Sequence, residues 1–131
     1  MDNLKFHHIG VATKCIEKEL RQFEKLGYKP ISDIFVDDVQ KIKGLFISAP
    51  GQPCLELLEN STEDGPLNGL LNQGVKFYHF AYETNNMEPL VASMVDDGAF
   101  VIVPITKATY FEKICFLMLR NKMIVEIVQP Y

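Results

Sequence analysis

The sequence contains only three cysteines, Cys15, Cys54 and Cys115, which lie far apart along its 131 residues. No two of them form a CxxC pair, so the sequence gives no sign of a zinc knuckle or of a disulfide framework. An odd number of widely spaced cysteines is typical of reduced, buried thiols in a protein of the cytoplasm. We therefore predict free thiols and a cytoplasmic protein.

The chain also lacks an excess of positive charge. Its 13 lysines and arginines face 17 aspartates and glutamates, which gives a net charge of −4. Proteins that bind nucleic acid by neutralising phosphates carry a basic surface, so we do not expect nucleic acid as a partner. Basic residues do gather late in the chain and could receive an anionic small molecule, but solvated surface positions are the simpler interpretation. These residues are Lys107, Lys113, Arg120 and Lys122.

Two kinds of apolar segment are missing as well. The N-terminal residues, MDNLKFHH, have none of the basic-then-apolar pattern of a signal peptide. No apolar run approaches the length of about 20 residues that a membrane-spanning helix needs. With 47% hydrophobic residues and enough length for a sizeable core, the chain is expected to be soluble, with no membrane partner.

What the sequence does contain is an internal repeat. Residues 6–13 read FHHIGVAT and residues 77–84 read FYHFAYET, so that His79 follows His8 by 71 residues. Later in each half, LELLE at 55–59 corresponds to VEIVQ at 125–129. Self-similarity at a fixed offset indicates two copies of one structural unit.

We therefore predict a single domain, residues 1–131, built from two tandem modules. The first module covers residues 4–60, the second covers 76–129, and a polar, turn-rich linker at 60–75 joins them. Each module is expected to contain a strand, a helix and three more strands. Expected strands are 6–12, 30–36, 40–48, 54–58, 77–83, 100–104, 113–119 and 123–128.

The expected helices begin near Ile16 and Met87, with a further short helical piece at 66–72. We expect Thr13 to cap the first helix and Gly27 to end it. The run from Asn85 to Glu88 has the form of a capping box for the second helix.

Alternation along the strands selects four polar side chains. His8 shares a strand face with Gly10 and Ala12, while Glu56 and Glu126 point away from the faces of their apolar neighbours. A carboxylate between apolar residues is costly to bury unless it is paired or bound to a metal. If the strands of both modules curve toward each other, His8, Glu56, His79 and Glu126 would meet in one cup.

Other polar and aromatic residues are given plainer interpretations. His7 lies on the face that packs against the helix, so we interpret it as a core residue. Glu59 and Gln129 are expected at strand ends in water. Core packing is expected for Tyr78, Tyr82 and Phe116, with lining of a pocket as the alternative.

Five motifs carry a resemblance to a known superfamily: FHHIGVA, LGY, LELLEN with DGPLNGLL, YHFAYE and VEI. Together they resemble the vicinal oxygen chelate superfamily of glyoxalases, bleomycin resistance proteins and dioxygenases, and most closely its methylmalonyl-CoA epimerase branch. The resemblance runs nearly end to end. It implies an α+β fold in which two tandem βαβββ modules form a cupped, metal-binding mixed sheet. It also implies the metal ligands His8, Glu56, His79 and Glu126, the same set that the repeat selects.

The resemblance further implies an activity. One divalent ion per chain (Co, Ni, Mn, Zn or Fe) would be bound, since mixed nitrogen and oxygen ligands without sulfur suit these metals. The implied reaction is an epimerase-like isomerisation, in which Glu126 removes a proton next to a carbonyl or thioester through a metal-stabilised enolate. A glyoxalase I-like lactoylglutathione lyase and a non-catalytic small-molecule binding or resistance protein are the alternatives. The implied substrates are an acyl-CoA or a glutathione thiohemiacetal, and the implied assembly is a homodimer.

The sequence departs from this branch in two places. A histidine-proline-lysine turn and a glycine pair usually precede the last strand, but here the shorter run from Leu119 to Met123 takes their place. Some relatives use an extra carboxylate in the strand that matches 40–48. No aspartate or glutamate lies between Val39 and Leu55, so no second base is evident there.

Overall fold

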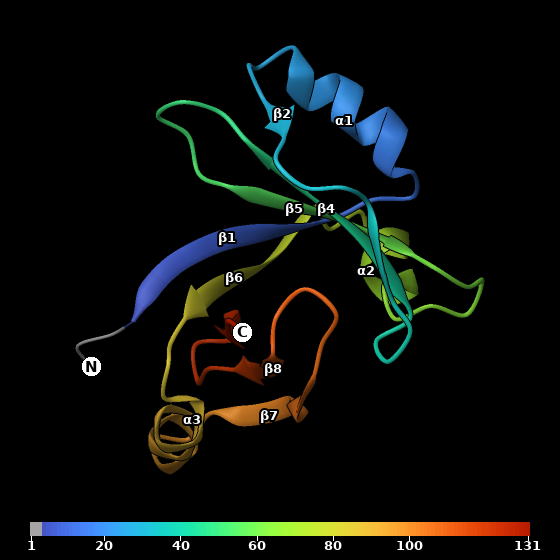
Figure 1. The fold of residues 1–131 in the computed structure, drawn as a ribbon. Coiled ribbons are helices and arrows are strands. Elements are labelled where there is room, and N and C mark those ends of the chain that lie inside the picture. Colours follow the sequence, from blue (N-terminus) through green and yellow to red (C-terminus); the bar gives the residue numbers. More distant parts are fainter. Residues whose placement is uncertain (1–3) are drawn as a thin grey trace. The chain divides into compact units, whose positions relative to one another are not determined.

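The structure, a computed structural model, describes residues 4–131, which form nine strands and three helices (Figure 1). The chain divides into two compact units, one of residues 4–7 with His79–Tyr131 and one of His8–Tyr78. Strands β1 (Lys5–Ala12) and β6 (Phe77–Glu83) each begin in one unit and continue into the other. The other elements are α1 (Ile16–Glu24), β2 (Lys29–Pro30), β3 (Phe35–Asp37), β4 (Ile42–Ser48), β5 (Leu55–Asn60), α2 (Asn68–Asn72), α3 (Met87–Asp96), β7 (Phe100–Lys107), β8 (Lys113–Met118) and β9 (Ile124–Gln129).

In the unit His8–Tyr78 the strands follow the order β2-β4-β5-β1, and β3 pairs with another part of β4. β1 runs parallel to β5, whereas β4 and β5 are antiparallel. Helix α1 packs one apolar stripe against these strands: Ile16 is buried, and Leu20 and Phe23 pack beside it. Burial of this stripe stabilises the helix in place, because a nine-residue helix is marginal on its own.

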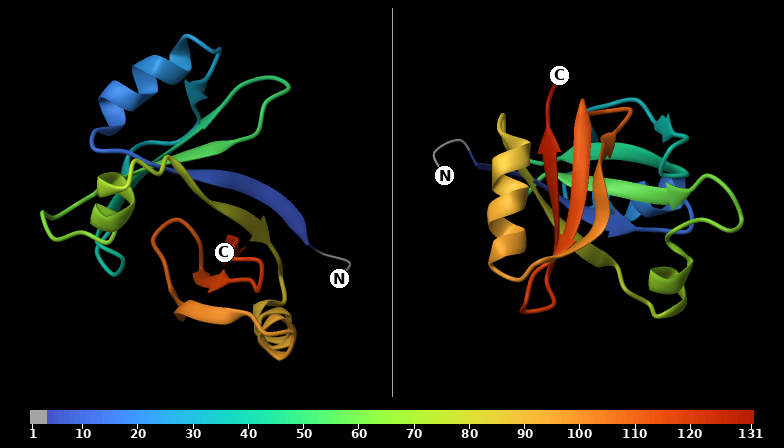
Figure 2. Two further views of the ribbon diagram at one scale, coloured as in Figure 1. Left: turned by 180° about the vertical axis from the view of Figure 1, so that it is seen from behind. Right: turned by 90° about the horizontal axis from the view of Figure 1, so that it is seen from below.

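The other unit repeats this plan with strand order β6-β9-β8-β7. β6 runs parallel to β9, and the remaining pairs are antiparallel. The right-hand view of Figure 2 shows α3 running alongside these strands. Its buried side chains, Met87, Leu90 and Val91, pack with β8 and β9 residues in a second core cluster.

The predicted α+β class and the tandem βαβββ plan are confirmed. The predicted strand 30–36 was wrong, because this segment forms two short strands, β2 and β3, on either side of a bend. Ser32 lies between β2 and β3, and its side-chain hydroxyl accepts a hydrogen bond from the backbone N–H of Phe46 at 3.0 Å. In a continuous strand a backbone carbonyl would accept this bond. The single-domain organisation and the linker boundaries stay predictions.

The predicted N-terminal helix caps were wrong, whereas Gly27 ends α1 as predicted, with a φ of 97° and its N–H donating to the Glu24 carbonyl at 3.1 Å. Cys15 and Asn86 occupy the N-cap positions, and neither makes a side-chain capping bond. Thr13 instead accepts a hydrogen bond from the Cys15 N–H, which shapes the turn before α1. The first helical N–H groups are bonded by side chains from far along the chain, Glu59 for α1 and Gln129 for α3. Both side chains lie at strand ends as expected, but they are half-buried and bonded to the helices rather than placed in water.

The three cysteines are free, as predicted, but only Cys115 is buried, while Cys15 and Cys54 are half-buried. The expectation of three buried thiols was thus correct for one of them. Among residues 4–131, no helix is both long enough and apolar enough to cross a membrane.

Candidate metal centre

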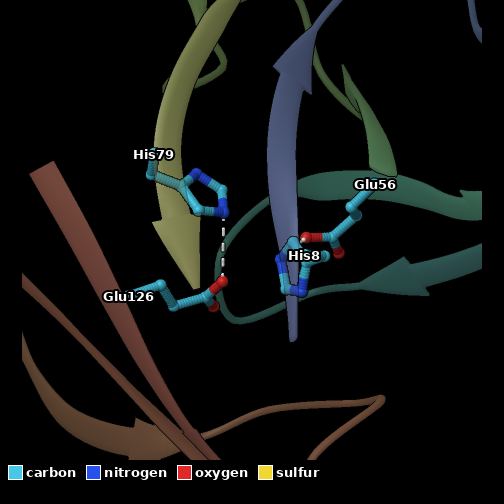
Figure 3. A group of neighbouring side chains, drawn as sticks. All are labelled: His8, Glu56, His79 and Glu126. Carbon is cyan, nitrogen blue, oxygen red and sulfur yellow. Dashed lines mark ion pairs between the residues drawn. The ribbon is translucent and has the colours of Figure 1, made fainter. Parts of the chain in front are cut away.

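The first candidate pair lies in the unit His8–Tyr78. Parallel pairing of β1 with β5 places Gly10 directly opposite Glu56, and His8 shares the strand face of Gly10. Because Gly10 has no side chain, the Glu56 carboxylate can lean toward the neighbouring imidazole. His8 Nε2 lies 2.9 Å from Glu56 Oε1. Figure 3 shows these two side chains next to each other. Both are buried, His8 at 0% and Glu56 at 6% exposure.

The second pair repeats this geometry in the other unit. Ala81 on β6 stands opposite Glu126 on β9, and His79 shares the face of that small residue. His79 Nε2 lies 3.1 Å from Glu126 Oε1, an ion pair drawn as a dashed line in Figure 3. The exposures are 2% and 5%. The repeat in the sequence therefore produces a repeated His–Glu pair in three dimensions.

Each pair also has an aromatic neighbour. Phe46 on β4 stands opposite Glu56, and its ring meets the His8 ring edge-on at a centroid distance of 5.1 Å. Phe116 on β8 does the same beside Glu126, at 5.0 Å from the His79 ring. Sequence reasoning named Phe116 and missed Phe46. The signal was present, since Phe116 follows Phe46 at the same offset of 70 residues as Glu126 follows Glu56.

The donor set fits a divalent metal ion. Each pair offers an imidazole nitrogen and a carboxylate oxygen, and all four residues are buried. Buried carboxylates require a counter-charge or hydrogen-bond donors, and a neutral imidazole supplies only part of that. Nitrogen and oxygen donors without sulfur suit Mn, Fe, Co, Ni and Zn. A buried His/Glu group of this kind could hold a metal ion.

The thiol of Cys54, near the first pair, is poorly suited to be a ligand. Cys54 lies two residues before Glu56 on the same strand face. Burial raises the pKa of the Cys54 thiol, and the negative charge of Glu56 raises this pKa further. The protonated thiol is therefore favoured, whereas metals bind the thiolate.

The remaining aromatic and histidine candidates contact the core. His7 is half-buried, with its ring edge-on to Phe111 at 5.1 Å. Tyr78 packs beside the cluster of Ile42, Leu58 and Leu67. Tyr82 packs against the α3 cluster. The structure thus brings each predicted histidine together with the glutamate of its own unit, and binding of one ion by both pairs stays a prediction.

Comparison with known proteins gives one family and a set of similar folds. A sequence model described as the Glyoxalase/Bleomycin resistance protein/Dioxygenase superfamily matches residues 7–116. A search of curated proteins finds no match. Among solved structures, the hypothetical protein BH1468 from Bacillus halodurans C-125 superposes with a TM-score of 0.84 at 20% identity, over 98% of this chain and 95% of that one.

Two further similar structures are enzymes by name. Methylmalonyl-CoA epimerase from Mycobacterium tuberculosis has a TM-score of 0.82 at 16% identity, covering 96% of this chain and 87% of its own. A single-residue variant of the Streptomyces coelicolor methylmalonyl-CoA epimerase, in complex with 2-nitronate-propionyl-CoA, has a TM-score of 0.81 at 19% identity, covering 98% of this chain and 99% of its own. At these identities the likeness is one of fold.

Proposed function

Because the chain belongs to the glyoxalase/bleomycin resistance protein/dioxygenase superfamily, we propose that it is a metal-dependent enzyme that moves a proton on the carbon next to a carbonyl or thioester. The observation that carries this proposal is the pair of buried, repeat-related His–Glu contacts, 2.9 Å in one unit and 3.1 Å in the other. A chain built only for packing has no need to keep both in the middle of apolar strands.

In this proposal His8, Glu56, His79 and Glu126 bind one divalent ion together, of Co, Ni, Mn, Zn or Fe. Two carboxylates balance the charge of the ion, and four protein donors leave open positions in a six-coordinate shell. When bound, the ion supplies stabilisation of the negative charge that develops on the carbonyl oxygen as the proton leaves. The apolar strand faces on either side of each pair exclude water, which strengthens that interaction.

Glu126 is the proposed base. Its Oε1 lies beside His79 Nε2, which holds the carboxylate in place. A carboxylate held in this way can take a proton from the substrate carbon next to the carbonyl and return it. Phe116 stands directly opposite Glu126 and contacts the His79 ring, so it restricts how both side chains turn. His79 would orient Glu126 between the two proton transfers.

The similar folds favour an epimerase-like isomerase that acts on an acyl-CoA. Two of them are methylmalonyl-CoA epimerases, one in complex with a propionyl-CoA analogue. A glyoxalase I-like lactoylglutathione lyase is the second candidate, since proton transfer on a glutathione thiohemiacetal needs the same base and the same charge stabilisation. A non-catalytic small-molecule binding or resistance protein is the third. Four buried metal-type donors favour the first two over the third.

One set of experiments tests the proposal. Purified protein should contain about one divalent ion per chain by mass spectrometry of metals, and His8→Ala and His79→Ala should each lose it. The metal-loaded protein, mixed with methylmalonyl-CoA or with the glutathione hemithioacetal of methylglyoxal in deuterated water, should exchange the proton next to the carbonyl. Full occupancy in the double His8→Ala/His79→Ala variant would reject the ligand set. Metal binding without exchange of either substrate would favour the binding protein.

We also propose a cytoplasmic homodimer. Strand β7 is the last in its unit's order, and it exposes three apolar side chains, Phe100 at 69%, Ile102 at 42% and Ile105 at 36%. A long apolar edge strand is a common place for self-association. Sedimentation of the parent at micromolar concentration should give a dimer, and a monomer under these conditions would reject the assembly.

A further inference from the structure

A hollow of about 360 Å³ lies within the unit His8–Tyr78, where the end of β1, the start of α1 and residues 71–76 meet. Backbone hydrogen bonds fix its walls. The Ala12 N–H donates to the Lys76 carbonyl at 2.8 Å, and the Thr13 N–H donates to the Leu58 carbonyl at 2.9 Å. Its volume falls in the range of about 300 to 1,000 Å³ that is usual for small-molecule sites.

The lining of this hollow has a charge opposite to that of the whole protein. Three lysines line it, Lys14, Lys18 and Lys76, against one carboxylate, Glu19. Glu19 is engaged by Lys76, whose Nζ lies 2.6 Å from Glu19 Oε1. In the part of the chain that the structure describes, no carboxylate forms an ion pair with Lys14 or Lys18. A protein of net charge −4 thus concentrates positive charge at this place.

Lys14 and Lys18 lie at the N-terminal end of α1, where Glu17 and Glu19 supply the carboxylates that favour this end of the helix. Lys14 precedes α1 and Lys18 lies in its first turn, at the helix end where the dipole disfavours cations. The first two backbone N–H groups at this end are already bonded, since the Cys15 N–H donates to Thr13 and the Ile16 N–H donates to Glu59. The lysine ammonium groups, rather than the helix N-terminus, are therefore the groups available to an anion.

We propose that this hollow binds the phosphate group of a small molecule. Lysine is a compact point charge with three donors, which suits phosphate without demanding a fixed planar geometry. Ala12, Leu71 and Val75 provide apolar lining for the carbon part of the same ligand. His8 lies four residues before Ala12 on β1, roughly 13 Å along the strand, so a long substrate could reach both places. That last link rests on the proposed function, whereas the phosphate site itself does not.

The site is tested by NMR titration of the metal-free full chain with pyrophosphate and with ADP, at an ionic strength held constant with sodium chloride. Both ligands should shift the amide signals of residues 13–22 and 74–76. The double variant Lys14→Gln/Lys18→Gln should bind about tenfold more weakly, because it loses two charged donors. The control Lys107→Gln/Lys122→Gln makes the same change in net charge outside the hollow and should bind within about twofold of the parent. Equal weakening in both variants, or shifts spread over all surface lysines, would overturn the proposal.

A second measurement shows whether the bound phosphate belongs to a CoA substrate or to a separate phosphorylated ligand. Proton exchange is compared between a CoA thioester and its truncated thioester, which lacks the nucleotide phosphates. If the hollow holds the substrate's phosphates, Lys14→Gln/Lys18→Gln raises KM for the CoA thioester about tenfold and leaves kcat and the truncated substrate unchanged. If pyrophosphate binds but KM does not change, the hollow serves a separate phosphorylated ligand. Binding in a protein without exchange activity supports the hollow and rejects only the proposed function.

Discussion

Glu59 Oε1 accepts a hydrogen bond from the backbone N–H of Ile16 at 2.8 Å, across 43 residues of sequence. The same bond recurs in the second module, where Gln129 Oε1 accepts from the Met87 N–H at 3.3 Å. Glu59 stands three residues after Glu56, and Gln129 stands three residues after Glu126. Each strand that presents a candidate glutamate ligand, β5 or β9, therefore also holds the first N–H of its module's helix.

Removal of this bond should destabilise the first module. Glu59→Ala leaves the Ile16 N–H at the start of α1 without its acceptor, and we expect a loss of roughly 1 to 2 kcal/mol in the free energy of unfolding. Glu59→Gln should lose less than half of that, because glutamine performs this role at position 129. Urea denaturation measures both.

Lys43→Ala is the matched control, since Lys43 pairs with the other Glu59 oxygen at 3.1 Å and is partly exposed. Its loss should stay below about 1 kcal/mol. If Lys43→Ala costs as much as Glu59→Ala, the ion pair rather than the helix contact is the stabilising interaction.

Glu126→Gln separates the proposed base from a ligand. Glutamine keeps an oxygen donor beside His79, so metal content should stay near that of the parent, while proton exchange should fall by roughly 10² to 10⁴. Occupancy and exchange are measured on the same sample. Glu56→Gln is the matched variant in the other module, and it should reduce exchange much less. The reverse ranking would assign the base to Glu56.

Gly44 has a tight aromatic neighbour. A Cβ at this position would overlap the Phe35 ring, which itself stacks on Phe46 at a centroid distance of 5.8 Å. Gly44→Ala should therefore cost roughly 1 to 3 kcal/mol in the free energy of unfolding and displace the Phe35 ring. The double variant Gly44→Ala/Phe35→Ala removes the clash and should recover part of the loss relative to Phe35→Ala alone. Strict additivity of the two single losses would show that the ring does not rest on Gly44.

Cys115 should make the protein less stable in alkali. Burial raises the pKa of this thiol from 9.0 to about 11. Above pH 9 the unfolded chain loses the proton while the folded chain keeps it, so stability falls as pH rises from 9 to 11. This thiol should lower the free energy of unfolding by roughly 3 kcal/mol over this range, at about 1.4 kcal/mol for each pH unit.

The measurement compares urea unfolding of the parent and of Cys115→Ala at pH 8 and pH 11. Cys115→Ala starts lower because of the cavity it creates, but its stability should decline less with pH. Parallel declines in the two proteins would assign the alkaline loss to lysines and tyrosines.

The repeat made most of the fold and both His–Glu pairs predictable from sequence. Strand β6 was predicted with its observed bounds, because alternation and the match to residues 6–13 agree there. Local patterns failed where a distant residue replaces a local one. Thr13 does not cap α1, and the predicted capping box from Asn85 to Glu88 does not form at α3, because Glu59 and Gln129 bond the first helical N–H groups from β5 and β9. Ser32 likewise interrupts a predicted strand through a bond to Phe46, 14 residues away.

The phosphate hollow could not be predicted for a related reason. Lys14, Lys18 and Lys76 are unremarkable singly, and Lys76 lies 58 residues beyond Lys18. Only the backbone bond between Ala12 and Lys76 brings the third lysine to the first two. The late basic residues, which the sequence indicates are mainly solvated surface, are a different group, and one of them, Lys113, is engaged by Glu88 in the structure.

Each half of the chain contains its own His–Glu pair, its own aromatic neighbour to that pair and its own side-chain bond to the first helical N–H. The surroundings of the two pairs are nevertheless not identical. Gly44 with its overlying Phe35 occurs in the first half, whereas Ile114 occupies the corresponding position 70 residues later. A substitution at such a position therefore changes the surroundings of one pair and leaves the equivalent position of the other half as it is.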